Sequence, residues 1–217
     1  MTPSPCPAIV LACLAGWLTW SSPAALAADE KPARSYQDGP LTSDDYRASP
    51  PDDSPLSAWT VTDIRWDYRY RCQQTGRTSR GYLTEFKADA IMVPAQSWNR
   101  HPDDKPLQDH EQGHFDLAMM AAWRTRLKFG DEQQRRQMMA TGSTPEVAID
   151  NLKNKLEREL LATRARLLDE HHEYDRVTQH GRARAAQVEQ RKAQLASLRE
   201  LAAAVKKLEA KRSGGTP

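Results

Sequence analysis

The most constraining feature of this sequence is a change in the spacing of its apolar residues. From Ile64 to Cys72 every second residue is apolar and the residues between them are polar or charged, which is typical of a strand with one buried face. From Leu107, and again from Ile149, apolar residues fall three or four positions apart, which predicts long amphipathic helices. Because a half-buried strand must pair and be covered, we expect an α+β fold with helices packed on an antiparallel sheet.

The strand region predicts a β-hairpin. The stretch QQTGRTSRG after Cys72 supplies turn residues, and a second extended run follows from Tyr82 to Val93 before Pro94 ends it. We expect the aromatic residues of this hairpin to pack in the core rather than to bind a ligand.

The N-terminal segment has the composition of an export signal. Residues 1–28 carry no charged side chain, and the apolar run Ile9 to Trp20 precedes Ala25-Leu26-Ala27, an arrangement that signal peptidase accepts. The sequence therefore predicts a signal peptide over residues 1–27 and a periplasmic or secreted protein. The apolar run is too short for a transmembrane helix. Cys13 offers a weaker alternative, a lipoprotein acceptor site.

The segment after the signal is expected to be a flexible leader. Residues 28–55 contain five prolines among Asp, Ser and Ala and few large apolar residues, a composition typical of flexible segments. Cleavage would also leave Cys72 as the single cysteine, so the mature chain would form no internal disulfide.

The stretch HEQGH lies in the first predicted helix. His110 and His114 are one helical turn apart, so both imidazoles point to one place, where a zinc ion can bind. Glu111 lies beside them, placed to take a proton from water as a general base. Gly113 is a mid-helix residue that costs about 1 kcal/mol relative to Ala, which suggests a close backbone approach. The alternative interpretation is a pair of hydrogen-bonded core histidines.

A catalytic zinc site usually has three protein ligands, so a residue downstream must complete the predicted site. The apolar stripe that begins at Ile149 continues on the same helix face to His171 and Tyr174, and Gly181 is a plausible helix stop that would turn His180 toward the domain. His180 is the first candidate for the third ligand, and His171 and Asp175 are the alternatives.

Two stretches together carry a resemblance to a known family. HEQGHFDLA and, from Tyr174 to Gly181, YDRVTQHG resemble a bacterial domain family of unknown function that is described as secreted zinc-dependent proteases. Its pattern has HExGHFD on one helix, YDxxTxHG on a later one and aromatic-rich strands ahead of both, so the resemblance covers about residues 56–187. It implies His110 and His114 as zinc ligands, Glu111 as the general base and His180 as the natural third ligand.

Three further residues of these signatures have open roles. Asp116 lies about 200° around the helix from His114, so we expect it to anchor a neighbouring segment rather than to bind the metal. Asp175 can accept a hydrogen bond from a ligand histidine or cap a turn. Tyr174 can stabilise an oxyanion as a catalytic residue through its hydroxyl, or it can be a buried structural tyrosine.

The C-terminal segment predicts a basic helix. Residues 182–212 hold nine Lys and Arg against three Glu, with an irregular leucine stripe. We expect residues 56–187 to form a zincin-like metal-binding domain and residues 188–217 a basic helical tail that associates with itself or with a partner. No nucleic acid is expected as a partner, because no aromatic residues are interleaved with the charges.

The predicted function is that of an exported zinc-dependent hydrolase with one Zn²⁺, most simply a metallopeptidase acting on a peptide or protein. A hairpin edge near the metal helix would let an extended substrate add as a further strand. The alternative is a non-catalytic envelope protein with a structural metal site and a partner-binding helix.

Overall fold

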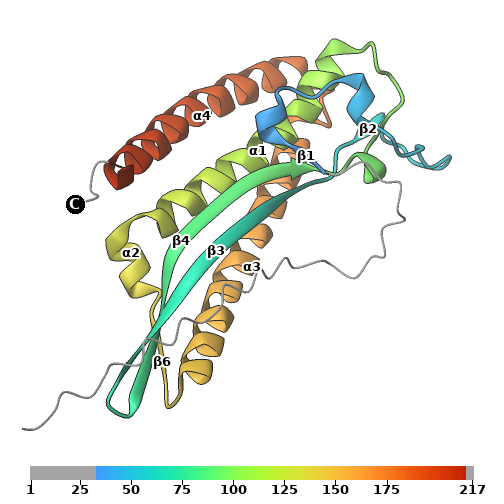
Figure 1. Cartoon of the computed structure of the whole chain (residues 1–217). Coiled ribbons are helices and arrows are strands. Elements are labelled where there is room, and N and C mark those ends of the chain that lie inside the picture. The colour runs from blue at the N-terminus through green and yellow to red at the C-terminus, as the bar shows by residue number, and fades with distance from the viewer. Residues whose placement is uncertain (1–32, 214–217) are drawn as a thin grey trace, which may run out of the picture.

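A computed structural model describes residues 33–213, and within them the predicted α+β fold is confirmed (Figure 1). An antiparallel sheet packs against two long helices, and a third helix lies on the outer side of the first. The signal peptide predicted over residues 1–27 lies outside the described residues. The strands are β1 Arg34–Ser35, β2 Ala58–Trp59, β3 Thr62–Thr75, β4 Thr78–Met92, β5 Trp98–Asn99 and β6 Ala140–Gly142. The helices are η1 Tyr36–Asp38, η2 Ser43–Asp45, η3 Pro94–Gln96, α1 Lys105–Gly130, α2 Glu132–Gln137, α3 Pro145–Thr178 and α4 Arg184–Ser213.

The predicted hairpin is the long ribbon β3–β4. Its register runs from Thr62 opposite Met92 to Thr75 opposite Thr78, with one irregularity between Arg69 and Tyr70. Strand β1 pairs with β4 at one end of the ribbon and β6 pairs with it near the other end, so β3 is an outer strand of this sheet. A separate short sheet joins β2 to β5.

Period-two spacing gives the ribbon its covered face. Ile64 is buried in the core, and Trp66 and Tyr68 pack against it as partly buried side chains. Basic side chains of α3 cover two of the aromatic rings, since the guanidinium of Arg164 lies 4.4 Å from the Trp66 ring centre and the Lys153 amine 5.4 Å from that of Tyr70. The aromatic residues therefore pack within the fold, as expected.

Helix α1 lies in the middle of the molecule. Its first turn is capped by the Asp104 side chain, which accepts from the Leu107 amide at 3.1 Å. The helix packs on β4 on one side and on α4 on another, so nearly every residue from His110 to Ala122 is buried. Polar residues in this stretch must consequently find partners inside the protein.

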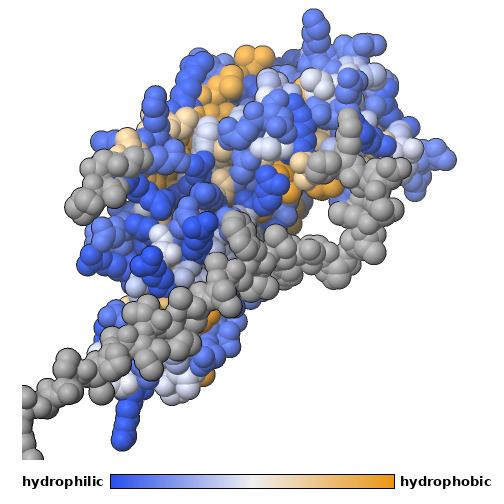
Figure 2. Space-filling view, in the orientation of Figure 1, coloured by the Kyte–Doolittle hydropathy of each residue, from blue (hydrophilic) through white to orange (hydrophobic). Residues whose placement is uncertain are grey.

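Helix α4 differs from the tail predicted over residues 188–217. It packs along α1 as a layer of the fold, with Leu198 and Val205 buried. A Cβ atom on Gly130 would lie 2.3 Å from the Leu208 side chain, which shows how closely the two helices approach. The expected boundary at residue 187 therefore falls inside α4. Figure 2 shows an apolar patch over this helix, which exposes Val188 and Leu195.

The leader predicted over residues 28–55 also differs from the structure, where residues 34–48 pack on the domain and residues 51–53 are exposed. Strand β1 pairs with β4, and the Tyr36 ring meets that of Phe115 edge-on with centroids 5.0 Å apart. The Leu41 amide donates to Gln112 on α1 at 2.8 Å. Composition indicated flexibility, but a few tertiary contacts with α1 hold this segment.

One negative finding concerns membranes. No helix within residues 33–213 is long and apolar enough to span a bilayer.

Candidate metal centre

Three side chains from two helices converge where α1 meets the end of α3. His110 and His114 on α1 each place Nε2 3.1 Å from the same oxygen, Oδ1 of Asp175 on α3. The potential ligand atoms of these three residues all lie within 4.8 Å of one another, and both histidines are buried. Two imidazole nitrogens and one carboxylate oxygen are a donor set that divalent transition metals accept.

The close crossing of α1 and α3 depends on Gly113. A Cβ atom at this position would lie 2.2 Å from the Tyr174 hydroxyl oxygen, far inside van der Waals contact. The Tyr174 ring also stacks on the His110 imidazole, with centroids 4.8 Å apart and planes 10° from parallel. The mid-helix glycine therefore marks a close approach, as the sequence suggested, and the approach fixes the plane of one imidazole.

The tautomer of His110 follows from its partner on α4. Gln187 Oε1 lies 3.1 Å from His110 Nδ1 and accepts the Tyr174 hydroxyl at 3.2 Å. The Gln187 amide nitrogen points the other way, to Asp109. Since a carbonyl oxygen only accepts, His110 carries a proton on Nδ1. In the neutral ring, Nε2 then presents a lone pair to Asp175.

His114 has a corresponding partner in His171. Their Nδ1 atoms lie 2.9 Å apart, so one donates to the other, and His171 Nε2 lies 3.3 Å from the Thr62 hydroxyl. Burial and then the neighbouring His114 lower the pKa of His171 to about 3, so His171 is neutral at pH 7. When His114 is the donor in this pair, its Nε2 also presents a lone pair to Asp175.

The charges of the three residues are strongly coupled. Burial would lower the pKa of His110, but the hydrogen bond to Asp175 and the charge of Glu111 outweigh burial and raise it. Burial would raise the pKa of Asp175, but hydrogen bonds from His110 and His114 hold it well below its usual range. The Asp175 carboxylate is therefore ionised, and it favours the protonated form of His110.

The residues fit a bound cation. Two neutral imidazoles whose Nδ1 protons are committed elsewhere would aim lone pairs at one carboxylate oxygen, which is repulsive unless positive charge lies between them. A proton can supply that charge, and so can a metal ion, which needs these deprotonated atoms as ligands. Gln187 and His171 would hold the two rings from behind, as outer partners of metal-binding histidines do.

His180 lies at the same carboxylate oxygen. Its Nδ1 is 3.3 Å from Asp175 Oδ1, and nearly half of its side chain is exposed. It occupies the turn after α3, where Gln179, His180 and Gly181 all have positive φ angles of 50°, 53° and 79°. This left-handed turn brings His180 back over the helix end, while a Cβ on Gly181 would lie 3.1 Å from His110 Cβ.

Glu111 is also buried, at 3% exposure, and has a partner that the sequence did not indicate. Its Oε2 accepts a hydrogen bond from Thr60, just before β3, and the Tyr46 hydroxyl lies 3.1 Å from the same threonine oxygen. No local pattern predicts this contact, because Thr60 lies 51 residues from Glu111 along the chain.

Two other signature residues, Tyr174 and Asp116, are hydrogen-bonded to neighbouring elements of the fold. The buried Tyr174 hydroxyl is engaged by Gln187 and, at 3.4 Å, by the His110 carbonyl. Asp116 is 2% exposed and accepts from Tyr36 at 2.8 Å and from Arg191 at 2.7 Å. Its predicted role as an anchor is confirmed, and it anchors both the N-terminal segment and α4.

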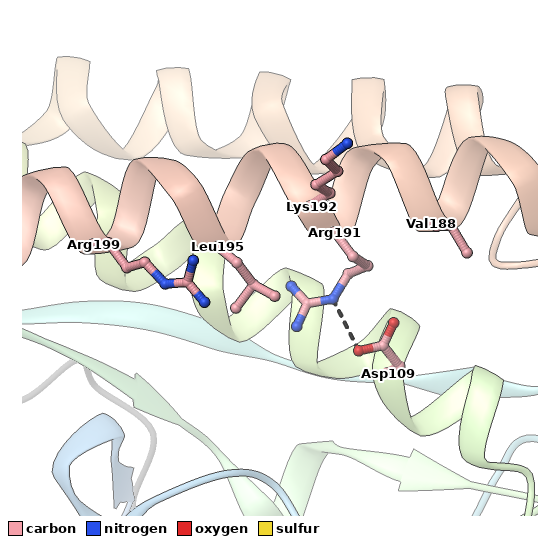
Figure 3. A pocket seen from close by; sticks show the side chains of 6 residues that line it. All are labelled: Asp109, Val188, Arg191, Lys192, Leu195 and Arg199. Carbon is pink, nitrogen blue, oxygen red and sulfur yellow. Dashed lines mark hydrogen bonds and ion pairs between the residues drawn. The ribbon is translucent and has the colours of Figure 1, made fainter.

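The candidate metal-binding residues His110, His114 and Asp175, called the metal group below, border neither of two hollows on the surface. A shallow hollow of about 390 Å³ lies over α4, and Figure 3 shows the Arg191 guanidinium crossing from α4 to Asp109 there. A second hollow lies among α1, α3 and α4 and includes Tyr174 in its wall. Neither is bordered by His110, His114 or Asp175.

Comparison of the chain with models of protein families, with curated proteins and with solved structures finds no match. Interpretation of the site consequently depends on its own residues.

Proposed function

We propose that this protein is a metal-dependent hydrolase, with zinc as the ion and peptide bonds as the substrate. One observation carries the proposal. His110 and His114, one turn apart on α1, present Nε2 to a single oxygen of Asp175, while Glu111, also buried, lies between them in the sequence. That combination places candidate ligands and a candidate base within a single helical turn.

The proposed ligands are His110, His114 and Asp175. A set of two histidines and one carboxylate is known from catalytic zinc sites, which keep a further position open. Zinc in such a site polarises a carbonyl group and lowers the pKa of water to about 7. His180, the third ligand expected from the sequence, is proposed instead to be a half-exposed group at the rim, where it can hold a substrate or complete the ligand set.

The proposed chemistry of the protein groups is general acid–base catalysis. The Glu111 carboxylate accepts a proton from water as the water adds to the carbonyl, and then donates it to the leaving amine. Tyr174 was a candidate for oxyanion stabilisation. Because its hydroxyl is engaged by Gln187, we propose that Tyr174 supports the His110 ring rather than contacting substrate.

The sheet edge supports a peptide substrate. Strand β3 is an outer strand of the described sheet, and its first residue, Thr62, contacts His171 beside the metal group. An extended peptide that paired with this edge would run close to the metal ligands. Main-chain pairing of this kind suits a peptidase better than a hydrolase of small molecules.

A second function has one observation in its favour. If His180 binds together with His110, His114 and Asp175, four protein donors close the coordination sphere, as in structural zinc sites. The protein would then be a non-catalytic envelope protein whose metal stiffens the fold and whose α4 binds a partner.

The test compares metal content with hydrolysis of an unfolded protein substrate. Glu111→Gln should keep zinc and lower hydrolysis by roughly 100-fold or more, because only the proton acceptor is lost. Asp175→Asn should lose most of the zinc. His180→Ala should keep zinc if the site is open and lose it if the site is closed. A zinc-loaded parent that cleaves nothing, with zinc lost in His180→Ala, would favour the structural site.

A further inference from the structure

We propose that Thr60 and Tyr46 are positioning residues for Glu111, so that Thr60, just before β3, and Tyr46 of the N-terminal segment complete the proposed catalytic site. The inference rests on the proposed function, because it assigns Glu111 the role of base. It adds two hydroxyl groups from outside both signature stretches. One of them, from Tyr46, lies in the segment that composition predicts to be a flexible leader.

The direction of these hydrogen bonds follows from the final acceptor, Glu111. An ionised carboxylate only accepts, so the Thr60 hydroxyl donates its proton to Glu111 Oε2. The Thr60 oxygen is then free to accept, and the Tyr46 hydroxyl, 3.1 Å away, is its donor. Tyr46, Thr60 and Glu111 thus form a chain in which each hydroxyl fixes the rotation of the next group.

One buried residue fixes the backbone next to both hydroxyls. The Ser97 carbonyl accepts from the amides of Arg47 and Ala48, each at 3.0 Å, directly after Tyr46. The Ser97 side-chain oxygen accepts from the amide of Val61, directly after Thr60, at 2.9 Å. Ser97 is fully buried. Tyr46 and Thr60 are therefore held at fixed positions relative to each other.

The same segment is bound to α1 itself. The Gln112 side chain, next to Glu111, accepts from the Leu41 amide at 2.8 Å and donates to Asp116 at 2.7 Å. Asp116 in turn accepts from Tyr36. Because the segment and the helix that carries Glu111 are joined at several points, the hydroxyls are fixed relative to the carboxylate and not merely close to it.

The geometry points to positioning rather than to simple burial. The bond from Thr60 engages Oε2, and Oε1 has no hydrogen-bond partner within residues 33–213. A carboxylate fixed through one oxygen keeps the other in a defined place, as the proposed role of Glu111 as a base requires. A general base that loses such support can reach the same proton only in a fraction of its conformations.

The experiment uses zinc-loaded full-length protein and four variants. Thr60→Val keeps the side-chain volume and removes the donor, and Thr60→Ser keeps the donor. Tyr46→Phe removes the outer link. Thr75→Val, at the far end of the hairpin, is the matched control. Zinc content, kcat and KM for an unfolded protein substrate, and crystal structures of the parent and Thr60→Val are measured.

We expect kcat to fall about 10- to 100-fold in Thr60→Val with KM and zinc content unchanged, since outer-sphere partners contribute effects of this size. Thr60→Ser should retain most of the parent kcat, Tyr46→Phe should show a smaller loss, and Thr75→Val should match the parent. In the crystal, the Glu111 carboxylate of Thr60→Val should rotate or adopt more than one conformation.

Two results would overturn the proposal. One is a parent-like kcat in Thr60→Val, and the other is a loss of zinc or of folded protein in both Thr60→Val and Tyr46→Phe, which would make the hydroxyls structural. If the parent hydrolyses nothing, the proposed function fails, and the crystal structures still decide positioning, because an unmoved Glu111 in Thr60→Val contradicts it.

Discussion

Among single residues, Gly113 sets the distance between the two helices that carry the metal group. Alanine is the better helix former by about 1 kcal/mol, so on an isolated helix Gly113→Ala would stabilise. Here the added methyl would lie 2.2 Å from the Tyr174 hydroxyl oxygen and 2.6 Å from the ring carbon that bears it. The collision involves a side chain that is buried and whose hydroxyl is hydrogen-bonded to Gln187.

We therefore predict that Gly113→Ala lowers the free energy of unfolding by about 1–3 kcal/mol, the usual cost of overpacking. Tyr174→Phe removes the nearest clashing atom. Gly113→Ala should therefore lower the free energy of unfolding less in the Tyr174→Phe background than in the parent. Urea denaturation of the four proteins measures this. Equal losses in both backgrounds would mean that Tyr174 is not what Gly113 accommodates.

The histidine pair was predictable because its spacing is local. His110 and His114 are four residues apart on a helix, so their shared direction follows from helix geometry alone. The contact between Asp175 and both rings is not local, and it depends on where α3 crosses α1. The approach of His180 depends on a left-handed turn that two non-glycine residues, Gln179 and His180, adopt. Gly181 predicted that the chain turns His180 toward the domain, but the positive φ angles of the two residues before it are rare for non-glycine residues and were not predictable.

Among the elements, α4 contributes the buried cation Arg191 to α1. Its guanidinium lies 2.7 Å from Asp116 and 3.1 Å from Asp109, and the side chains of Arg191 and Asp116 are 8% and 2% exposed. Burial would lower the pKa of Arg191, but the two carboxylates outweigh burial and raise it. A pair of this kind is costly to break, because one charge is left without a partner.

Arg191→Met is predicted to lower the free energy of unfolding by about 3–5 kcal/mol, since Asp116 would keep a buried charge. Adding Asp116→Asn removes that charge and keeps an acceptor for Tyr36 and Gln112, so the double variant should recover part of the loss. Arg199→Met, at an exposed position of the same helix, should change stability by no more than about 0.5 kcal/mol. Chemical denaturation separates these outcomes, and a neutral Arg191→Met would refute the anchoring role.

The hairpin and the long helices were predictable, because each repeats its pattern over many residues. The packing of α4 was not, since its leucine stripe is irregular and its contact with α1 includes a buried ion pair between Arg191 and Asp116. The order of the N-terminal segment was not predictable for a related reason. Its composition is that of a flexible leader, and its order comes from single contacts such as Tyr36 with Asp116, 80 residues apart.

At the scale of the whole molecule, the proposed metal binding would link stability to pH. In the metal-free protein the folded-state pKa of His110 is above the ordinary histidine value of 6.5. Its contribution to stability is therefore fully present below about pH 6.5 and is lost as pH rises through the folded-state pKa. A zinc ion at the proposed site would require the deprotonated ring, so stabilisation by zinc would have the opposite pH dependence.

We predict that the rise in melting temperature caused by zinc grows between pH 5.5 and 8, roughly the range in which histidines titrate. Thermal unfolding with and without zinc at several pH values measures it, and adding a chelator at pH 8 should remove the rise. His110→Ala is the control in which zinc should have little effect at any pH. A zinc effect that is constant across this range would exclude His110 as a ligand.

Two segments that are distant in sequence meet on one buried carboxylate, and this has a consequence for the order of folding. Asp116 receives Tyr36 from 80 residues before it and Arg191 from 75 residues after it. Before Tyr36 and Arg191 make these contacts, the Asp116 charge would be buried without partners. The centre of α1 therefore cannot pack stably until both contacts form. During vectorial synthesis, the core should therefore remain open until α4 emerges, and chains that stop before α4 should stay incompletely folded.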